Sequence, residues 1–291
     1  MRAEVVGWAE GVLGAAITEV AELSGGLTST MLALTDASGQ QAVLRLMTKD
    51  PWRAHGRELT RRECAAQQEL ALTAIPAPQS IGLDAEGAVA GVAMHLMSRL
   101  PGVPTTEVTD GALAAMARML ATIHDVRPAE PFRTFQSWAW EAKWVTPPWT
   151  AHPESWQRAF EILAAEPPSY RPTFLHRDYT HRNLLWSGGD ISGVVDWVET
   201  STGPVWLDAG HAATTLALDY GPEPARDFLT RYAALATEEP HAYWLIMDAV
   251  GFLPPPGREP LFGSPCQLRR LDQWVHDLVG RGRKLAAAAV G

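Results

Sequence analysis

The sequence predicts an α+β protein with two lobes: a front lobe with a five-stranded antiparallel sheet and one inserted helix, and a larger, mainly helical back lobe. Two observations support this class. Strand-like segments separated by turn residues fill the first hundred residues, and helical patterns dominate the rest of the chain. The composition changes near Ser98–Gly102, so we assign residues 1–98 to the front lobe and residues 99–291 to the back lobe.

The front lobe is expected to begin with a helix that ends near Gly14. A second helix is expected over Arg57–Leu72, because its Glu, Ala, Gln, Leu and Arg residues favour helix and two prolines follow it. Turn residues such as Asp36–Gly39 separate the predicted strands. These strands are ITEVAEL, LTSTMLAL and QAVLRLM, then Gln79–Leu83 and Val89–Met97.

The back lobe is expected to begin with a helix for which Asp110 is the candidate N-cap. One face of this helix carries the apolar spacing of a buried stripe, made of Leu113, Met116, Ala117, Leu120 and Ile123. A stretch rich in Trp and Pro follows, over Phe132–Trp156. The later predicted helices are Leu207–Leu218, Pro224–Leu235, Ala242–Gly251 and Leu268–Ala287.

Charge and composition exclude several classes of protein. The chain has 291 residues and a net charge of −9, which argues against a nucleic-acid binder. An acidic chain fits a cationic small molecule or partner, although mild acidity is also common among soluble proteins. Isolated Cys64 and Cys266, the absence of a long apolar run and an acidic N-terminal segment favour a soluble, cytoplasmic protein without a membrane partner. The oligomeric state does not follow from the sequence.

The segment around residue 178 carries the most specific chemical signal. His176, Arg177 and Asp178, followed by Asn183, match the kinase pattern H-R-D-x-x-x-x-N. In that pattern Asp178 accepts the proton of the attacking hydroxyl and Asn183 offers an oxygen to Mg²⁺. A predicted hairpin then leads to Asp196, a second oxygen ligand suited to magnesium. The alternative is a capped loop with surface carboxylates.

A glycine-containing turn between the first two strands is the candidate phosphate cradle. Its glycines allow close approach of the backbone, and its amides and hydroxyls can donate to phosphate oxygens. The alternative is an ordinary hairpin. The candidate residues are Ser24, Gly25, Gly26, Thr28, Ser29 and Thr30.

Arg45 is the candidate cation for the phosphates. Strand alternation places Val43, Arg45 and Met47 on one face of the third strand. A charge among apolar strand residues needs a partner when it is buried, and Glu63 on the following helix is the expected one. The alternative is an edge-strand arginine that reaches solvent.

With these residues in hand, the sequence resembles the aminoglycoside phosphotransferase family of small-molecule kinases, which have a bilobal, protein-kinase-like fold. The resemblance covers nearly the whole chain and is most specific in HRDYTHRNLLW and VVDWVETSTGPVWLDAG. It implies that Asp178 is the base, that Asn183 and Asp196 bind Mg²⁺, and that Ser24–Thr30 bind phosphate. It also implies adenine at the connection formed by Met97, Ser98 and Leu100. ATP is the implied phosphate donor, and the sequence does not distinguish it from GTP.

Three positions depart from the usual family pattern. Arg45 stands where Lys is usual, although guanidinium also binds phosphate. Thr180 replaces a common histidine, with His181 one place further along, and Arg177 replaces a frequent glycine. None of these exchanges removes a proposed catalytic group. They distance the chain from well-known aminoglycoside enzymes.

Asp208 and His124 are interpreted as structural. Asp208 precedes a helix rich in Ala and Leu, so it is expected to cap that helix or to hydrogen-bond toward the catalytic loop. His124 ends the buried stripe of its helix and is expected to be a hydrogen-bonded helix-end histidine.

The acceptor is expected to be a small molecule, with a cationic antibiotic such as an aminoglycoside preferred and another hydroxylated metabolite as the alternative. Aromatic rings can hold sugars or cations, although single tryptophans are more often core residues. The tryptophans concerned are Trp138, Trp140, Trp144, Trp149, Trp156, Trp244 and Trp274. The acidic residues that could hold a cation are Glu141, Glu199, Asp219 and Asp248.

Two other classes compete with a kinase. A metallohydrolase would use His176, Asp178 and His181 as metal ligands, but it leaves Asn183 and Asp196 without roles. A nucleotide-binding pseudoenzyme would fit the exchange at residue 45, whereas retention of the other site residues argues against it.

Overall fold

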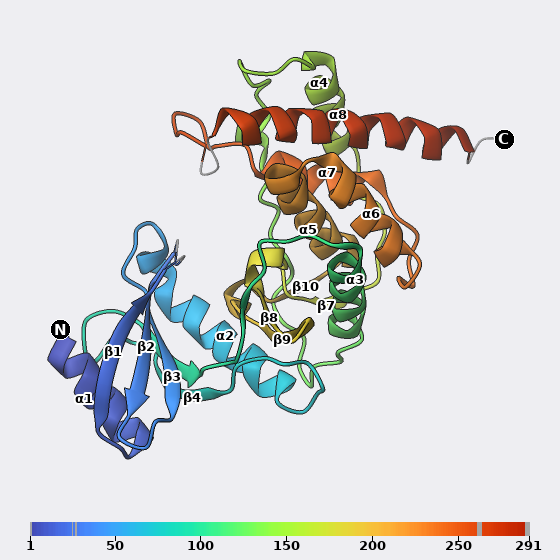
Figure 1. The fold of residues 1–291 in the computed structure, drawn as a ribbon. Helices are drawn as coiled ribbons and strands as arrows, with labels where there is room; N and C mark the ends of the chain where they lie inside the picture. The colour runs from blue at the N-terminus through green and yellow to red at the C-terminus, as the bar shows by residue number, and fades with distance from the viewer. Residues whose placement is uncertain (1, 25, 27, 261–263, 289–291) are drawn as a thin grey trace. The chain divides into compact units, whose positions relative to one another are not determined.

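The computed structural model describes residues 2–24, 26, 28–260 and 264–288 (Figure 1). The chain packs as two compact units. The first contains Met1–Val103 and Leu184–Thr200, and the second contains Pro104–Asn183 and Ser201–Gly291. The hairpin before Thr200 therefore packs with the N-terminal residues. The assignment of residues 1–98 and 99–291 to two functional lobes stays a prediction.

The first unit is built on the five-stranded antiparallel sheet that the sequence predicts, in the order β1-β2-β3-β5-β4 (Figure 1). A second, three-stranded sheet has the order β6-β8-β9. The helices are α1 (Arg2–Leu13) and α2 (Gly56–Leu70). The strands are β1 (Ile17–Leu23), β2 (Thr30–Asp36), β3 (Gln41–Leu46), β4 (Ser80–Asp84), β5 (Met94–Ser98), β6 (Val103–Pro104), β8 (Leu184–Ser187) and β9 (Asp190–Val194).

The two faces of the five-stranded sheet have different partners. Leu44 and Leu46 of β3 lie in an apolar cluster with Val5 and Ala9 of α1. The alternate residue Arg45 points to the other face, where it contacts α2. Because successive strand residues face opposite sides, this one strand carries both core residues of the unit and a predicted site residue.

One predicted strand is shorter than expected. Val89–Ala93 form a turn, and β5 begins only at Met94. The carboxylate of Asp84 accepts hydrogen bonds from the backbone N–H groups of Ala88 and Val89, at 3.0 and 2.9 Å. These bonds fold the apolar segment into a turn, so its strand-like composition is overridden.

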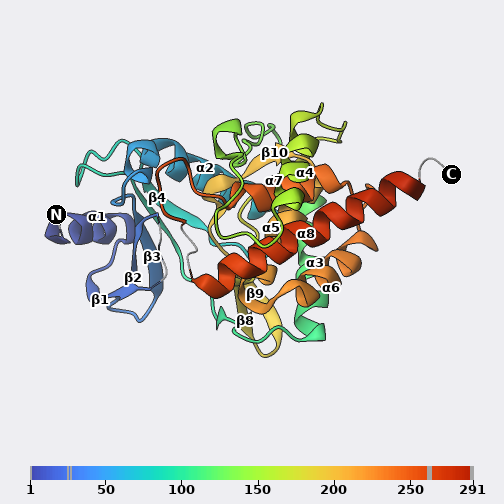
Figure 2. The ribbon, with the colours of Figure 1, turned by 90° about the horizontal axis from the view of Figure 1, so that it is seen from above.

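The second unit is mainly helical, with α8 packed along α5 and α7 (Figure 2). A two-stranded sheet pairs β7 with β10. The helices are α3 (Asp110–His124), α4 (Pro153–Ala164), α5 (Val205–Tyr220), α6 (Pro222–Ala233), α7 (Ala242–Gly251) and α8 (Pro265–Ala288), and the strands are β7 (Thr173–Leu175) and β10 (Ser201–Gly203).

Two details of this unit correct the sequence analysis. Thr109, not Asp110, is the N-cap of α3, because its hydroxyl accepts a hydrogen bond from the N–H of Ala112 at 3.2 Å. Helix α4 begins at Pro153, within the stretch rich in Trp and Pro, and continues to Ala164. The sequence analysis predicted no helix there. Proline at a first helical position is favourable, so this start had a local signal. The apolar stripe predicted for α3 is buried throughout.

Within the described residues no helix is both long and apolar enough to span a bilayer.

Replacement of Leu44 by Ala tests the predicted core. Leu44 is fully buried in β3, opposite Leu32 and Leu96 on its two neighbouring strands. We expect Leu44→Ala to lower the free energy of unfolding by about 2–5 kcal/mol, since the cavity adds to the lost burial. Urea unfolding followed by circular dichroism measures this. The control Leu72→Ala, at a residue 88% exposed, should change it by less than about 0.5 kcal/mol. Equal effects of the two variants would contradict the assignment.

Candidate active site

The backbone around His176 and Arg177 is held by one buried carboxylate. Asp208, near the start of α5, accepts hydrogen bonds from the N–H of His176 at 2.8 Å and from the N–H of Arg177 at 2.7 Å. Arg177 has a φ of 74°, in the region that favours glycine. Such strain costs about 1–3 kcal/mol and persists where other contacts hold it. The predicted structural role of Asp208, a hydrogen bond toward this loop, is confirmed.

His124 also contacts the Asp208 carboxylate. Its Nε2 lies 3.2 Å from an Asp208 oxygen and its Nδ1 lies 2.6 Å from the Tyr232 hydroxyl. Burial raises the pKa of Asp208, but the hydrogen bond from His124 and nearby positive charge outweigh it and lower the pKa. Asp208 is therefore an ionised acceptor, and the interpretation of His124 as a hydrogen-bonded helix-end histidine is confirmed.

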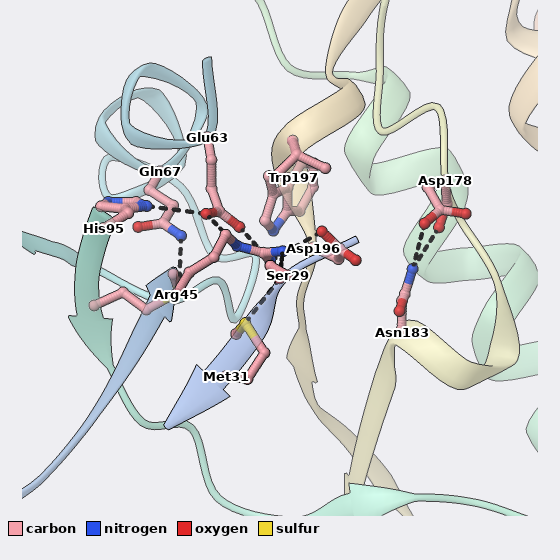
Figure 3. A network of polar contacts seen from close by, with 12 residues as sticks. Ser29, Met31, Arg45, Glu63, Gln67, His95, Asp178, Asn183, Asp196 and Trp197 are labelled. Carbon is pink, nitrogen blue, oxygen red and sulfur yellow. Dashed lines mark hydrogen bonds and ion pairs between the residues drawn. The ribbon is translucent and has the colours of Figure 1, made fainter. Parts of the chain in front are cut away.

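Asp178 directly follows the strained residue and has a partner on each of its carboxylate oxygens. Oδ1 lies 2.9 Å from Nε2 of His211. Oδ2 accepts from Nδ2 of Asn183 at 3.1 Å, a contact drawn in Figure 3. Burial raises the pKa of Asp178. Hydrogen bonding and positive charge from His211, with contributions from His176 and Asn183, reverse this and lower the pKa. Asp178 is thus an ionised carboxylate, the state that a base requires.

Asn183 ends the short 3₁₀ turn η3 (His181–Asn183). Its Nδ2 donates to the backbone oxygen of Asp178 at 2.9 Å as well as to the side chain. The amide nitrogen is therefore committed to the loop, and the amide oxygen on the other side of the group is the atom left to bind a cation. This orientation suits the predicted role of Asn183 as a neutral oxygen ligand.

Asp196 belongs to the first unit, directly after the hairpin of β8 and β9. It has a φ of 70°. Among the described non-glycine residues, Arg177 and Asp196 are the two with positive φ, and both lie in predicted site segments. The Asp196 carboxylate accepts from Nη2 of Arg45 at 2.9 Å (Figure 3).

Arg45 is the centre of a buried polar cluster in the first unit (Figure 3). Its Nε and Nη2 donate to the two oxygens of Glu63, both at 3.0 Å, and its Nη1 donates to the Ser29 hydroxyl at 3.1 Å. The predicted pairing with Glu63 is confirmed. The alternative of a solvent-exposed edge-strand arginine is wrong, because Arg45 is 3% exposed and β3 lies between two other strands.

His95 adds a second cation to Glu63, and sequence reasoning missed it. It lies directly opposite Arg45 in the β3–β5 pairing, so both side chains reach α2 from the same face of the sheet. Nδ1 of His95 lies 2.9 Å from Glu63, and Nε2 lies 2.9 Å from the Ser80 hydroxyl. Strand alternation of residues 93–98 places His95 on the face away from Leu96, which was the available signal.

The pKa values of this cluster follow from its charges. Burial raises the pKa of Glu63, but Arg45 and His95 outweigh it and lower the pKa to about 2. Burial lowers the pKa of His95, but contacts with Cys64 and Glu63 reverse this and raise it to about 9. The pKa of Arg45 is also raised, because attraction by Asp196 and Glu63 exceeds the effect of burial. At neutral pH the cluster holds two carboxylates and two cations.

The predicted phosphate loop is only partly described, since Gly25 lies outside the described residues. Ser24 is an exposed turn residue, and Thr28 is half-buried. Ser29 is buried, with its hydroxyl engaged by Arg45. The hydroxyl of Thr30 lies 2.7 Å from that of Thr48.

Gly26 is the point of closest packing in this loop. A Cβ at residue 26 would lie 2.4 Å from the Ser29 backbone oxygen, so this position requires glycine. Lys49, a cation that the sequence analysis did not single out, donates to the Gly26 carbonyl.

The predicted adenine connection begins with Met97 and Ser98, the last paired residues of β5, and continues to Leu100 beyond the strand. Met97 is buried and its sulfur accepts from the Gln67 amide at 3.5 Å. Ser98 exchanges hydrogen bonds with Gln79: its N–H donates to the Gln79 oxygen at 2.9 Å, and its hydroxyl accepts from the Gln79 N–H at 2.8 Å. Leu100 is half-buried. The nucleotide-binding role of these residues stays a prediction.

The histidines of the metallohydrolase alternative have other partners. Nδ1 of His176 accepts from the Asp178 N–H at 3.2 Å, and His181 lies 3.0 Å from Asp219. The described residues hold no group of three His, Cys, Asp or Glu side chains arranged around a metal position. This arrangement gives the alternative no support.

The tryptophans divide between core and site. Trp156, Trp244 and Trp274 are buried core residues, as expected for most single tryptophans. Trp138 instead packs beside the H-R-D segment: the Arg177 guanidinium lies 4.0 Å from the centre of its ring. Trp140 is 46% exposed.

With this geometry in place, the chain can be compared with known proteins. It matches the model of the phosphotransferase enzyme family over residues 19–244. The chain therefore belongs to this family, and the predictions of family and of phosphotransferase class are confirmed. No curated protein sequence matches the chain.

Solved structures resemble the whole chain at low sequence identity. Aminoglycoside phosphotransferase APH(4)-Ia is 17% identical, with 95% of this chain and 99% of that chain covered and a TM-score of 0.67. A putative aminoglycoside phosphotransferase from Ralstonia eutropha is 14% identical, with 98% of each chain covered and a TM-score of 0.63. Macrolide 2′-phosphotransferase MphH from Brachybacterium faecium is 14% identical, with 98% and 92% covered and a TM-score of 0.58. These likenesses confirm the predicted fold class.

The raised pKa of His95 predicts how stability depends on pH. A group whose pKa rises from 6.5 to about 9 on folding stabilises the protein fully below pH 6.5 and loses that effect as pH rises to 9. Between pH 6 and pH 9.5 the free energy of unfolding of His95→Gln should therefore decline less than that of the unaltered protein, by on the order of 3 kcal/mol. Urea unfolding at pH 6 and pH 9.5 measures it. In the control His55→Gln, at an exposed position, the free energy of unfolding should decline with pH as it does in the unaltered protein. An equally steep decline in His95→Gln would count against the ion pair.

Proposed function

We propose that this phosphotransferase moves the γ-phosphate of magnesium-bound ATP to a hydroxyl of a small molecule in the cytoplasm. The observation that carries the proposal is Asp178: an ionised, partly exposed carboxylate in the H-R-D-x-x-x-x-N segment, with its orientation fixed by His211 and Asn183. A nucleotide donor is also supported by a related protein, since a mutant of APH(4)-Ia forms a ternary complex with ADP and hygromycin B.

In the proposed reaction Asp178 orients the acceptor hydroxyl and takes its proton. As the acceptor oxygen bonds to the γ-phosphorus, the bond from that phosphorus to the leaving ADP oxygen breaks. Arg45 is proposed to bind phosphate oxygens, and Glu63 with His95 holds the guanidinium in place for this. Residues Ser24–Thr30 are proposed to contact the phosphates, and Met97–Leu100 the adenine.

The chemistry of two side chains fits magnesium. The amide oxygen of Asn183 and the carboxylate of Asp196 are hard oxygen donors of low total charge, the kind that Mg²⁺ prefers beside phosphates. When bound, the ion would neutralise phosphate charge that develops during transfer. Asp196 is ion-paired with Arg45 in this structure, so magnesium binding at that carboxylate would share or replace the contact.

A cationic antibiotic remains the proposed acceptor, but one observation favours the alternative of another hydroxylated metabolite. Three of the four carboxylates proposed to hold a cation already pair with basic side chains. Asp248 lies near His211 and Arg177, Asp219 near His181 and Arg182, and Glu199 near Arg62. The fourth, Glu141, is exposed, and no basic side chain within the described part of the chain forms an ion pair with it. This local neutralisation favours an acceptor with few positive charges.

Mass spectrometry of a compound panel tests the function directly. Purified protein with Mg²⁺ and ATP, or GTP in parallel, is incubated with hydroxylated compounds that carry none, one or several amino groups. We expect a phosphate-sized mass gain on at least one compound, and none with Asp178→Ala. Turnover should fall by about 10²–10⁴-fold in that variant while ATP binding, measured by calorimetry, is retained.

The matched control is Asp190→Asn, at the exposed first residue of β9, which should keep full turnover. Unchanged turnover in Asp178→Ala would reject the assigned base. Binding of Mg²⁺ and ATP without transfer to any compound would instead favour the pseudoenzyme.

The magnesium requirement tests Asn183 and Asp196. We expect Asp196→Asn and Asn183→Ala each to raise the magnesium concentration for half-maximal velocity by about 10–100-fold, the range seen when a metal site loses a supporting group. Velocity measured over a magnesium series with fixed ATP gives this value, and EDTA should abolish activity. The Asp190→Asn control should leave the series unchanged. If neither variant shifted the magnesium concentration for half-maximal velocity, Asn183 and Asp196 would be excluded as ligands.

A further inference from the structure

His211 lies between two carboxylates in the second unit. It belongs to α5 and is 5% exposed. Nε2 lies 2.9 Å from Oδ1 of Asp178, and Nδ1 lies 3.1 Å from Oδ1 of Asp248 on α7. A carboxylate accepts hydrogen bonds, and a neutral imidazole has only one N–H. Donation to both aspartates therefore requires the doubly protonated ring.

Aromatic side chains fix the plane of this ring. Trp138 packs edge-on, with ring centres 5.2 Å apart and an interplanar angle of 74°, and Phe252 stacks with centres 5.5 Å apart at 27°. Rotation of the imidazole away from the aspartates would therefore collide with packed rings. The aromatic walls also exclude water, which strengthens the charge interactions inside.

The charges around His211 are balanced. Asp178 and Asp248 are the carboxylates that face it, and Arg177 adds a second cation, with Nη1 3.5 Å from Asp248. His176 lies beside Asp178, and its Nδ1 accepts from the Asp178 N–H at 3.2 Å. Burial lowers the pKa of His211, but Asp248 and Asp178 outweigh this and raise it to about 9. The protonation required by the hydrogen-bond geometry thus agrees with the electrostatics.

We propose that His211 is a positioning residue for phosphoryl transfer: an imidazolium that bridges Asp178 and Asp248 and holds the Asp178 carboxylate in one orientation. This inference rests on the proposed function, in which Asp178 is the base. His211 occupies Oδ1 and Asn183 occupies Oδ2, so the carboxylate cannot rotate. The remaining lone pairs then point in fixed directions toward an acceptor hydroxyl. His211 itself keeps its two protons throughout the reaction.

Loss of the imidazolium has a consequence that a merely structural role would not produce. Without the imidazolium, Asp178 loses a hydrogen-bond donor and a neighbouring cation. The negative charges of Asp178 and Asp248 are then less compensated. The pKa of Asp178 should therefore rise, and the acid limb of the pH profile for kcat/KM should move to higher pH. Misorientation of the base should also lower kcat, by about 10²-fold.

Kinetics of His211→Gln test the proposal. We expect kcat to fall by about 10²-fold, the KM for ATP to stay unchanged, and the acid limb to shift upward. The control His276→Gln, at an exposed histidine of α8, should match the unaltered enzyme. Added imidazole should restore part of the activity of His211→Ala, because the deleted ring leaves a cavity of that shape. A fall in kcat with an unshifted acid limb and no rescue would overturn the positioning role.

Nitrogen NMR of the imidazole tests the protonation without any assay of activity. Spectra of the unaltered protein, with His211 assigned by its loss in His211→Gln, should show both ring nitrogens protonated from pH 6 to pH 8. A neutral ring at pH 7 would overturn the proposal. If the ring is protonated but Asp178→Ala keeps full turnover, the proposed base fails, and the positioning role fails with it. If Asp178→Ala is inactive and His211→Gln is unimpaired, only the inference about His211 is rejected.

Discussion

The carboxylate of Asp208 accepts hydrogen bonds from two consecutive backbone N–H groups, those of His176 and Arg177. The conformation of the H-R-D segment depends on this interaction. These two bonds hold Arg177 at a backbone angle that a non-glycine residue rarely adopts. The turn they enforce sends the Asp178 side chain toward α5, where His211 meets it. Loss of Asp208 would leave two buried N–H groups without an acceptor and release the strained residue. A residue that touches no substrate in our proposal thereby determines where the base lies.

Each unit uses the same electrostatic solution for a buried functional group. In the first unit Glu63 is shared by Arg45 and His95, and in the second unit His211 is shared by Asp178 and Asp248. A single buried charge would be costly, whereas a cluster with equal numbers of both signs stays ionised and rigid. Each group has at least two partners, so its rotamer is fixed before any ligand arrives. Preorganisation of this kind is what a transferring phosphoryl group requires.

Local patterns allowed much of the fold to be predicted, and tertiary contacts explain the rest. Alternation around Arg45 gave the correct face and the correct partner, because the period of a strand is a property of the backbone. Val89–Ala93 were misassigned because their composition favours strand. Backbone N–H groups at the start of this segment donate to the Asp84 carboxylate, and these bonds favour a turn instead. Asp248 was a candidate for holding a cationic substrate, but its pairing with His211 could not be predicted, since the two residues lie on two helices that no spacing rule connects. The H-R-D-x-x-x-x-N motif located Asp178 but carried no information on what orients it.

The discontinuity of the first unit has a consequence for how the chain acquires its structure. Its sheet is formed by the first hundred residues, yet Arg45 meets Asp196, which is 151 positions later in the chain. During synthesis from the N-terminus, the guanidinium is therefore made long before this acidic partner leaves the ribosome. An N-terminal fragment that stops at residue 103 would carry the five-stranded sheet without Leu184–Thr200, which belong to the same unit. The first unit is therefore complete only after this later segment has been synthesised.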